Sequence, residues 1–458
     1  MNARLLAVSL FVAGALSARS AGFRAGAAAV DITPTNLPVL VNGGFLSRSV
    51  DKVHTPLHAR ALVLDDGRTR VALVVVDTCI MGRPLIDEAK ALAAKATGIP
   101  ADRILVSATH THTAPSVFAC LGTGADEAYV PYLRARIADA VVAAQAALEP
   151  AQAGFARADA GAFTAVRRWI RRSDRVVEDP FSNQTVRANM HAAKNWDDVT
   201  GPSGPEDPEL SMISIRARDG RPLAVLANFS MHYYSDRDLS ADYFGLFCEG
   251  LRKRLAPDAA PGRAPFVGIL SHGCSGDIWR CDYTKPEAER DPWRDIAKYT
   301  GGLLDLAVAA LKDVRHRDDA DLAMAERRMT LDYRVPDRQR LEWAQRVGAP
   351  LADRPPKTQP EVYANEQMLL QQREAPDIVW QGLRIGDVAI ARARQMQDEG
   401  ADIVDVGGES TRPGSTGVSP DEEIGRTAPV IAAIRADGAL PVSIDTRKAV
   451  VARAAHAA

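Results

Sequence analysis

The chain has 458 residues, a length that suggests two or three domains of about 150 residues each. Hydrophobic residues make up 46% of it and charged residues 25%, and 56 basic against 58 acidic residues leave a formal net charge of −2. This composition provides enough apolar residues for a large core, and the balanced charge excludes the basic surface that nucleic-acid binding needs. The sequence shows no collagen, coiled-coil or helical repeat.

The N-terminal residues have the pattern of a signal peptide. Arg4 is followed by an uncharged, apolar run from Leu5 to Ala18 and then by small residues. The run is shorter than the ~20 residues of a membrane-spanning helix, so we expect residues 1–20 to direct export to the periplasm or the medium, with cleavage between Ala15 and Ala21. A buried N-terminal helix is the alternative. No later segment is long and apolar enough to span a bilayer.

Apolar runs and helical periodicity alternate from Ala28 to about Leu270, which predicts an α/β fold. The predicted strands are 71–77, 104–107, 212–215, 223–229 and 265–270, and the predicted helices are 85–96, 127–148 and 293–311. The Arg-, Asp- and Pro-rich residues 167–210 form a long irregular excursion of the kind that often builds a site. We expect 313–360 at the periphery and 382–390 as a hairpin.

The cysteines are too few and too scattered for a disulfide framework or a zinc ribbon. They are Cys79, Cys120, Cys248, Cys274 and Cys281. In an oxidising compartment one pair can form, and Cys274 and Cys281 are the nearest in sequence. None lies in a nucleophile motif, so we expect all of them to be structural.

Three of the predicted strands lead into polar residues suited to a binding site. His110 and His112 follow the strand 104–107, His232 follows 223–229, and the loop 271–277 follows 265–270. In open α/β sheets, ligands bind beyond the carboxyl ends of the strands, so we expect these three segments to share one site.

The spacing of the histidines favours a metal centre. In an extended segment residues i and i+2 point the same way, so His110 and His112 can enter one cavity, and His232 adds a third imidazole, the common ligand of catalytic zinc. Asp242 and Asp277 are candidates to ligate the metal or to orient the histidines. The alternative is a hydrogen-bonded loop around the first two histidines and a satisfied core residue at His232.

At four places the chain resembles the neutral/alkaline (non-lysosomal) ceramidase superfamily, over about residues 26–390. The matching motifs are Asp31-Ile-Thr-Pro34, Ala108-Thr-His-Thr-His112, Asn228-Phe-Ser-Met-His232 and Ser275-Gly-Asp277. The resemblance implies a mixed, layered α/β domain that uses zinc to hydrolyse the amide of N-acylsphingosine. It also implies His110 and His232 as zinc ligands and His112 beside the reacting carbonyl, and we expect His112 and Asp277 to be catalytic.

The chain departs from the family pattern in two ways. Trp279 stands where the family has a serine at the carbonyl, so a related amide or ester substrate, small or lipid, is at least as well supported as ceramide. The family's remaining zinc ligands, a Glu and a Tyr, follow the strand that corresponds to Gly386–Ile390, where this chain leaves the pattern. We therefore expect an incomplete and impaired hydrolase.

From Ala391 the sequence changes to the βα alternation of a parallel barrel. The run Asp405-Val-Gly-Gly-Glu-Ser-Thr-Arg-Pro-Gly414 resembles the signature of dihydropteroate synthase, a cytoplasmic folate enzyme that joins p-aminobenzoate to a dihydropterin pyrophosphate with Mg²⁺. The resemblance implies that Thr411 and Arg412 contact the pyrophosphate and that Asp445 contacts the pterin ring. A guanidinium suits phosphate oxygens, and a carboxylate suits the amino-amide edge of a pterin.

A complete barrel needs about 250 residues, so we expect residues 391–458 to be a partial (β/α)8 TIM-barrel fragment without synthase activity. The domains are then a signal peptide at 1–20, an incomplete ceramidase-like domain at 26–390 and a pterin-binding fragment at 391–458. This organisation indicates a fusion of two pieces, natural or from sequence assembly. The alternatives to the hydrolase are a dihydropteroate synthase acting through the tail and a non-catalytic metal-binding or lipid-binding protein.

Overall fold

The computed structural model describes the N-terminal part almost throughout and the C-terminal part in short pieces. The described residues are 22–257, 262–373, 377–386, 404–407, 419–421, 423–424, 427–428, 431–432, 442–445 and 448–457. The predicted signal peptide at 1–20 lies outside them. Among the described helices, none combines the length and the apolarity that a bilayer crossing needs.

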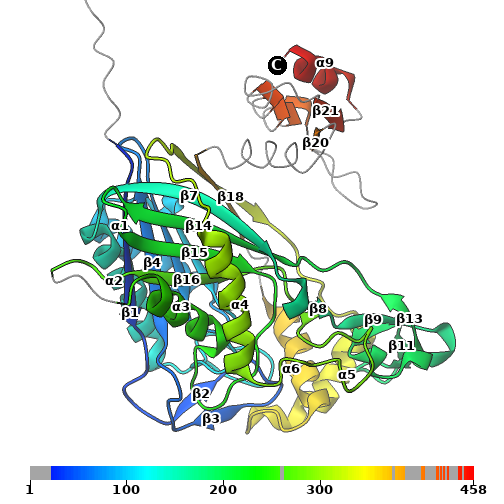
Figure 1. Ribbon diagram of the computed structural model, residues 1–458. Coiled ribbons are helices and arrows are strands. Elements are labelled where there is room, and N and C mark those ends of the chain that lie inside the picture. The colour runs from blue at the N-terminus through cyan, green and yellow to red at the C-terminus, as the bar shows by residue number, and fades with distance from the viewer. Residues whose placement is uncertain are drawn as a thin grey trace, which may run out of the picture.

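An eight-stranded mixed sheet organises the N-terminal part (Figure 1). Its strands, in spatial order, are β16 (Val267–His272), β15 (Pro222–Phe229), β14 (Glu209–Ala217), β7 (Glu149–Asp159), β1 (Arg24–Asp31), β4 (His58–Asp65), β5 (Arg70–Val76) and β6 (Ile104–Ala108). Only the two outer pairs, β5–β6 and β15–β16, are parallel. β1 and β7 share just the partners Arg24↔Pro150 and Ala25↔Glu149, so the sheet divides there into two halves.

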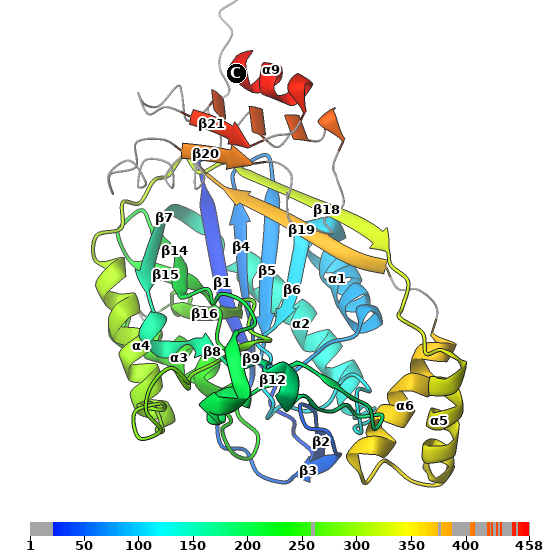
Figure 2. The same cartoon turned by 90° about the vertical axis from the view of Figure 1, so that its right-hand side faces the viewer.

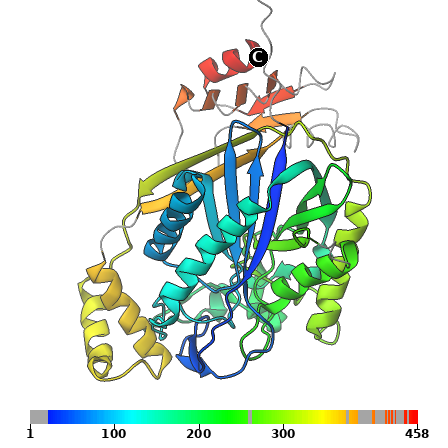
Figure 3. The same cartoon turned by 90° about the vertical axis from the view of Figure 1, so that its left-hand side faces the viewer.

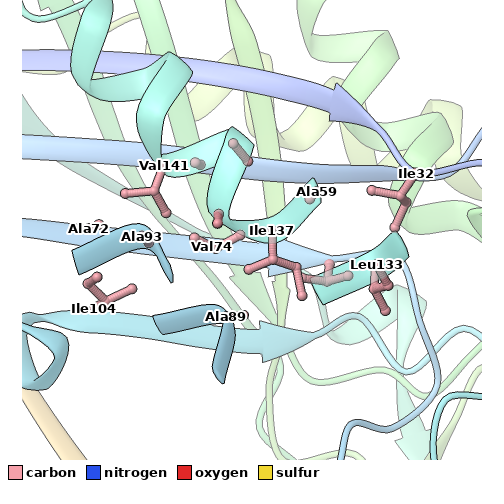
Figure 4. Close-up of a cluster of buried hydrophobic side chains, with 14 of the residues drawn as sticks. Ile32, Ala59, Ala72, Val74, Ala89, Ala93, Ile104, Leu133, Ile137 and Val141 are labelled. Atoms are coloured by element: carbon pink, nitrogen blue, oxygen red, sulfur yellow. The ribbon is translucent and has the colours of Figure 1, made fainter. Parts of the chain in front are cut away.

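Helices cover the outer face of each half. α1 (Arg83–Thr97) and α2 (Tyr129–Ala146) pack on the β1–β4–β5–β6 half, and α3 (Asp242–Leu255) and α4 (Ile296–Leu311) pack on the β7–β14–β15–β16 half (Figures 1 and 3). Figure 4 shows the first of these contacts, where Leu133, Ile137 and Val141 of α2 lie over Val74 of β5.

A third apolar cluster lies between the two halves of the sheet and makes the N-terminal part four layers deep. Leu62 and Leu64 of β4 share it with Ile215 of β14 and with Val267 and Ile269 of β16. Alternate residues of β4 point to opposite faces, so Ala59, Ala61 and Val63 join the helices on the outside. The mixed, layered α/β fold expected from the sequence is confirmed.

Smaller elements surround the end of the sheet at which β5, β6, β15 and β16 terminate (Figure 2). They are β2 (Val39–Val41), β3 (Arg48–Val50), β8 (Ala165–Val166), β9 (Arg168–Arg171), β10 (Val177–Glu178), β11 (Gln184–Val186), β12 (Ala188–Met190), β13 (Val199–Pro202), β17 (Ile278–Trp279), α5 (Arg338–Gly348) and α6 (Gln359–Gln372). The excursion predicted as irregular at 167–210 is therefore built from short strand pairs.

The hairpin predicted at 382–390 is wrong for its described residues. Residues 382–385 belong to a single strand, β19 (Asp377–Ile385), which pairs antiparallel over its whole length with β18 (Leu322–Thr330). The pairing partner lies about fifty residues earlier, so a pattern search confined to neighbouring residues misses it. The ladder also shows that 313–360 is not only peripheral, because Leu322 is buried in the cluster between the two halves.

In the C-terminal part, β20 (Val404–Gly407) and β21 (Val442–Asp445) form a parallel pair, and α9 (Ala449–Ala457) follows. The register places Gly407 beside Asp445 at the carboxyl ends of both strands. A parallel pair with a helix after the second strand is the arrangement expected of a piece of a (β/α)8 barrel.

Gly26 offers a test of the packing between β1 and α2. A Cβ atom at this position would lie 2.3 Å from the carbonyl oxygen of Ala144 and 2.7 Å from the amide nitrogen of Leu148, both backbone atoms. Gly26→Ala should lower the free energy of unfolding by about 1–3 kcal/mol, because the end of α2 must move. Urea denaturation measures this, with Gly382→Ala as the matched control, since a Cβ on that strand glycine meets nothing within 4 Å. Equal effects of the two substitutions would contradict the packing argument.

Candidate metal centre

Four histidines meet where strands of the two halves end. His110 and His112 follow β6, His232 follows β15, and His272 is the last residue of β16. The centroid of the His110 ring lies 4.6 Å from that of His112, 4.7 Å from that of His232 and 5.4 Å from that of His272. The structure therefore brings together the three histidines singled out from the sequence and adds His272.

The backbone orients the ring of His110. Its Nδ1 lies 2.9 Å from the carbonyl oxygen of Cys79, which can only accept, so Nδ1 carries the hydrogen and Nε2 keeps its lone pair. That Nε2 lies 3.1 Å from Nε2 of His112. His110 has φ = +66°, a left-handed conformation that is uncommon for a non-glycine residue and often marks a functional site.

Alternation along residues 110–113 divides this segment into a histidine face and a threonine face. The hydroxyls of Thr111 and Thr113 are buried and each lies 2.9 Å from the carbonyl oxygen of Ser240, to which they donate. These contacts anchor the segment from behind. The i, i+2 spacing thus presents His110 and His112 on the opposite face, as the sequence pattern predicts.

Two neighbours hold the ring of His112. The ring of Tyr233 stacks on it, with 3.6 Å between centroids and 14° between planes. Gly43 lies against the ring, and a Cβ added there would be 2.4 Å from its Cγ atom and 2.6 Å from its Nδ1 atom.

Asp242 shapes the turn that follows His232. Each oxygen of its fully buried carboxylate accepts two backbone N–H groups, which come from Tyr234, Ser235, Asp236 and Tyr243 at 2.7–3.1 Å. The sequence makes Asp242 a candidate to ligate a metal or to orient the histidines from behind. The observed contacts instead give it a backbone role, because its acceptor positions are taken by the segment that carries Tyr233.

Asp277 lies on the loop after β16 and its side chain is half exposed. One carboxylate oxygen is 2.5 Å from Nε of Arg168, a surface ion pair. Its backbone carbonyl accepts the N–H of Arg167, whose guanidinium in turn donates to the carbonyl of Gly276 at 2.8 Å and 3.1 Å. These bonds tie the loop to β8 and β9. The catalytic role expected of Asp277 stays a prediction.

Burial lowers the pKa of every imidazole in the group. It brings the pKa of His112 to about 3, that of His272 to about 4 and that of His232 to about 2, and it also lowers the pKa of His110. After burial, the largest contribution to the lowered pKa of His232 is the positive charge of Arg167. For His112 and His272 the second contribution to the lowered pKa is electrostatic repulsion by His110. At neutral pH the rings are uncharged, which is the state in which imidazole binds a metal.

Three of the four histidines, His110, His232 and His272, line a cleft of about 470 Å³ together with Cys79 and Ser275. In the described part of the chain, the ligand atoms of Cys79, His110 and His112 lie within 4.8 Å of one another, close enough to hold a metal ion. Burial raises the pKa of the Cys79 thiol to about 12, so this group stays protonated unless a cation is bound.

The sequence places the loop 271–277 in the predicted site but assigns no role to His272 or Ser275 within it, and it predicts that Cys79 is structural. The signal for His272 is its position at the end of a strand, the same feature that identifies His232. For Cys79 the corresponding signal is that it comes three residues after the end of β5, the strand parallel to β6.

In the tail, Thr411 and Arg412 lie outside the described residues, and only the backbone of Asp445 is described.

Comparison with known proteins gives one kind of match for the C-terminal part of the chain and another for its fold as a whole. Residues 375–458 match the family of pterin binding enzymes. The dihydropteroate synthase of Clostridium beijerinckii is 59% identical over 69 residues, which are 15% of this chain and 26% of that enzyme. The Bacillus subtilis enzyme is 53% identical over 66 residues, 14% of this chain and 23% of the relative. The chain thus spans about a quarter of the length of these relatives.

The fold of the remainder is that of neutral ceramidases. The crystal structure of neutral ceramidase from Pseudomonas aeruginosa has a TM-score of 0.54 at 16% identity and covers 93% of this chain and 69% of its own. A ceramidase complexed with C2 has a TM-score of 0.51 at 17% identity and covers 70% of this chain and 48% of its own. The chain therefore joins a neutral-ceramidase fold to a segment that matches the pterin binding enzymes, a TIM-barrel family, which confirms the fusion expected from the sequence.

Gly43 tests the packing around His112. Its φ is +104°, and Gly43→Ala would push a methyl group into the imidazole. His112 offers a ligand atom within 4.8 Å of those of Cys79 and His110, and its Nε2 contacts Nε2 of His110. We therefore expect this change to weaken transition-metal binding by about 10–100-fold, the usual effect of disturbing a residue that orients a ligand. Titration with Zn²⁺ followed calorimetrically measures it. Gly44→Ala is the control, because a Cβ there is 3.5 Å from its nearest neighbour, and equal weakening in both variants would contradict the packing argument.

Proposed function

We propose that the N-terminal part is a zinc-dependent hydrolase of amide or related ester bonds, with His110 and His232 as zinc ligands and His112 beside the reacting carbonyl. The observation that carries the proposal is the convergence of uncharged imidazoles on one cleft, with the tautomer of His110 fixed by the carbonyl of Cys79. A likeness of fold to ceramidases supports it but does not determine the substrate.

The donor set suits zinc, which favours imidazole nitrogen and thiolate sulfur. Zinc bound here would acidify a water molecule and polarise a carbonyl oxygen. The protein's own contribution is orientation. Tyr233 and Gly43 hold His112 in place, and Asp242 fixes the backbone that carries Tyr233. Arg167 adds positive charge near the rings, which favours the oxyanion that develops when a carbonyl is attacked.

The substrate we propose is a small or lipid amide, or the related ester, and N-acylsphingosine is one member of that class. Trp279 occupies the position at which the resemblance places a serine, and its ring lies 5.5 Å from that of Tyr233 and 6.5 Å from that of His232. An indole there narrows the approach to His232 compared with a serine.

We also propose export to the periplasm or the medium, on the strength of the apolar N-terminal pattern.

Replacing the proposed ligands tests the metal assignment. The double variant His110→Ala/His232→Ala should lose stoichiometric zinc, because each change removes an oriented nitrogen donor. Metal analysis of the purified protein after dialysis gives the zinc content. We expect the unsubstituted protein to bind zinc more weakly than a site with four protein ligands, since the sequence lacks the Glu and Tyr that the resemblance implies.

His316→Ala is the control for this experiment, because His316 lies outside the cleft and contacts Ser214 through Nε2 at 2.9 Å. It should retain the zinc content of the unsubstituted protein. Unchanged zinc in the His110/His232 double variant would show that the site is assigned to the wrong residues.

A second candidate function belongs to the tail. We propose that Thr411 and Arg412 contact a pyrophosphate and Asp445 a pterin ring, with Mg²⁺ as the partner of the pyrophosphate. The supporting observation is the 59% identity to a dihydropteroate synthase over 69 residues. Those residues are 26% of that enzyme, so for a polypeptide of residues 1–458 we expect some binding contacts without turnover, because catalysis depends on holding all reactants together.

Complementation of a strain that lacks dihydropteroate synthase tests the tail. We expect no growth without added folate, and binding of the dihydropterin pyrophosphate no tighter than about millimolar, which corresponds to roughly −4 kcal/mol. Growth that is lost on Arg412→Ala would overturn this expectation and make the synthase the function of the chain.

A further inference from the structure

Ser275 lies between two imidazoles of the cleft. Its Oγ is 3.3 Å from Nδ1 of His232 and in short contact with Nε2 of His272. Ser275, His232 and His272 all line the cleft of about 470 Å³, and Ser275 is only 5% exposed. No other feature of the proposed hydrolase uses this hydroxyl.

The direction of the two hydrogen bonds follows from counting hydrogens. A serine hydroxyl donates one hydrogen and accepts through two lone pairs. If His232 is to offer Nε2 to a metal, its Nδ1 carries the hydrogen and donates to Ser275 Oγ. The hydroxyl hydrogen is then directed at Nε2 of His272, which accepts it. A hydroxyl that donates to an imidazole nitrogen is the arrangement of an activated nucleophile and its base.

Hydrogen bonds to its backbone anchor the loop around Ser275 on both sides. Two glycines line the cleft beside Ser275: Gly273, two residues before it, and Gly276, the residue after it. The N–H of Gly273 donates to the carbonyl of Phe229 at 2.9 Å, and Arg167 holds the carbonyl of Gly276 from the other side. A Cβ at residue 273 would lie 2.3 Å from Ser230 Oγ, so the loop depends on glycine to approach β15.

We propose that Ser275 is the nucleophile of the hydrolase and that His272 is its general base, an inference that rests on the proposed function. Oγ bonds to the carbonyl carbon of the amide while its proton passes to Nε2 of His272. The C–N bond breaks, and the departing nitrogen takes that proton. Water then attacks the acyl ester and gives a proton to His272, the C–Oγ bond breaks, and Oγ regains the proton as the carboxylic acid leaves.

Acyl trapping tests the proposal directly. The full chain is mixed with p-nitrophenyl butyrate, quenched with acid and examined by intact and peptide mass spectrometry. We expect a burst of p-nitrophenol and a butyryl group on the peptide that contains Ser275. Ser275→Ala should lose the adduct and at least ~100-fold in turnover, while its zinc content is retained. His272→Ala should slow acylation by a similar factor, and Ser275→Cys should still form an acyl adduct, on the thiol.

Ser214→Ala is the matched control. Ser214 also contacts an imidazole, with its Oγ 2.9 Å from Nε2 of His316, but it lies on β14 outside the cleft. This variant should acylate and turn over like the unsubstituted protein.

The possible failures are distinguishable. Turnover with bound zinc but without an adduct, or a Ser275→Ala variant that keeps its turnover, would overturn the nucleophile and leave the metal hydrolase standing. Loss of zinc in Ser275→Ala in proportion to its loss of turnover, with no adduct in the parent protein, would overturn it too, because Ser275 would then only position His232. An adduct on Ser275 in a protein that binds no zinc would uphold the nucleophile and refute the zinc-dependent function.

Discussion

Parallel pairing in both halves of the sheet is the constraint on which the candidate metal centre depends. A parallel pair of neighbouring strands requires a crossover, and here the crossovers contain α1 between β5 and β6 and α3 between β15 and β16. The same two helices cover the outer faces of the two halves. The layered fold and the site therefore have the same cause. The crossovers that cover the sheet also return its strands to a common edge, where the residues at their carboxyl ends meet.

Packing four imidazoles at one edge is possible only if they stay uncharged, and hydrogen-bond partners help to orient them. The carbonyl of Cys79 is such a partner for His110, and the hydroxyl of Ser275 bridges His232 and His272. The arrangement has a conformational cost. His110 and Asp242 both have positive φ, at +66° and +54°, and strain of this kind costs on the order of 1–3 kcal/mol per residue. Fixed contacts from Ser240 and from the turn after His232 hold it in place.

The sequence predicts well the features of the site that depend on the spacing of residues close together in the chain. The i, i+2 rule places His110 and His112 on one face, and the end of a buried strand marks His232. His272 falls within the predicted site loop 271–277 but is not singled out, because the strand predicted at 265–270 ends two residues before β16 does. The partners of Asp242 and of Gly43 lie in folded turns and distant segments, which no periodicity reports. For the same reason residues 382–390 are predicted to form a hairpin, whereas residues 382–385 pair with the distant strand β18.

That ladder means that the border between two sequence families is not the border between two folding units. The pterin-binding match begins at residue 375, yet residues 377–385 pair with β18, and Ile385 is buried with Leu322 between the halves of the ceramidase-like sheet. The N–H of Gly386 still donates to the carbonyl of Asp321, at 2.8 Å. A truncation designed from the family match would remove a nine-residue strand from the N-terminal part and leave β18 as an unpaired edge, prone to pair with other chains. A cut placed after Gly386 would keep the ladder whole.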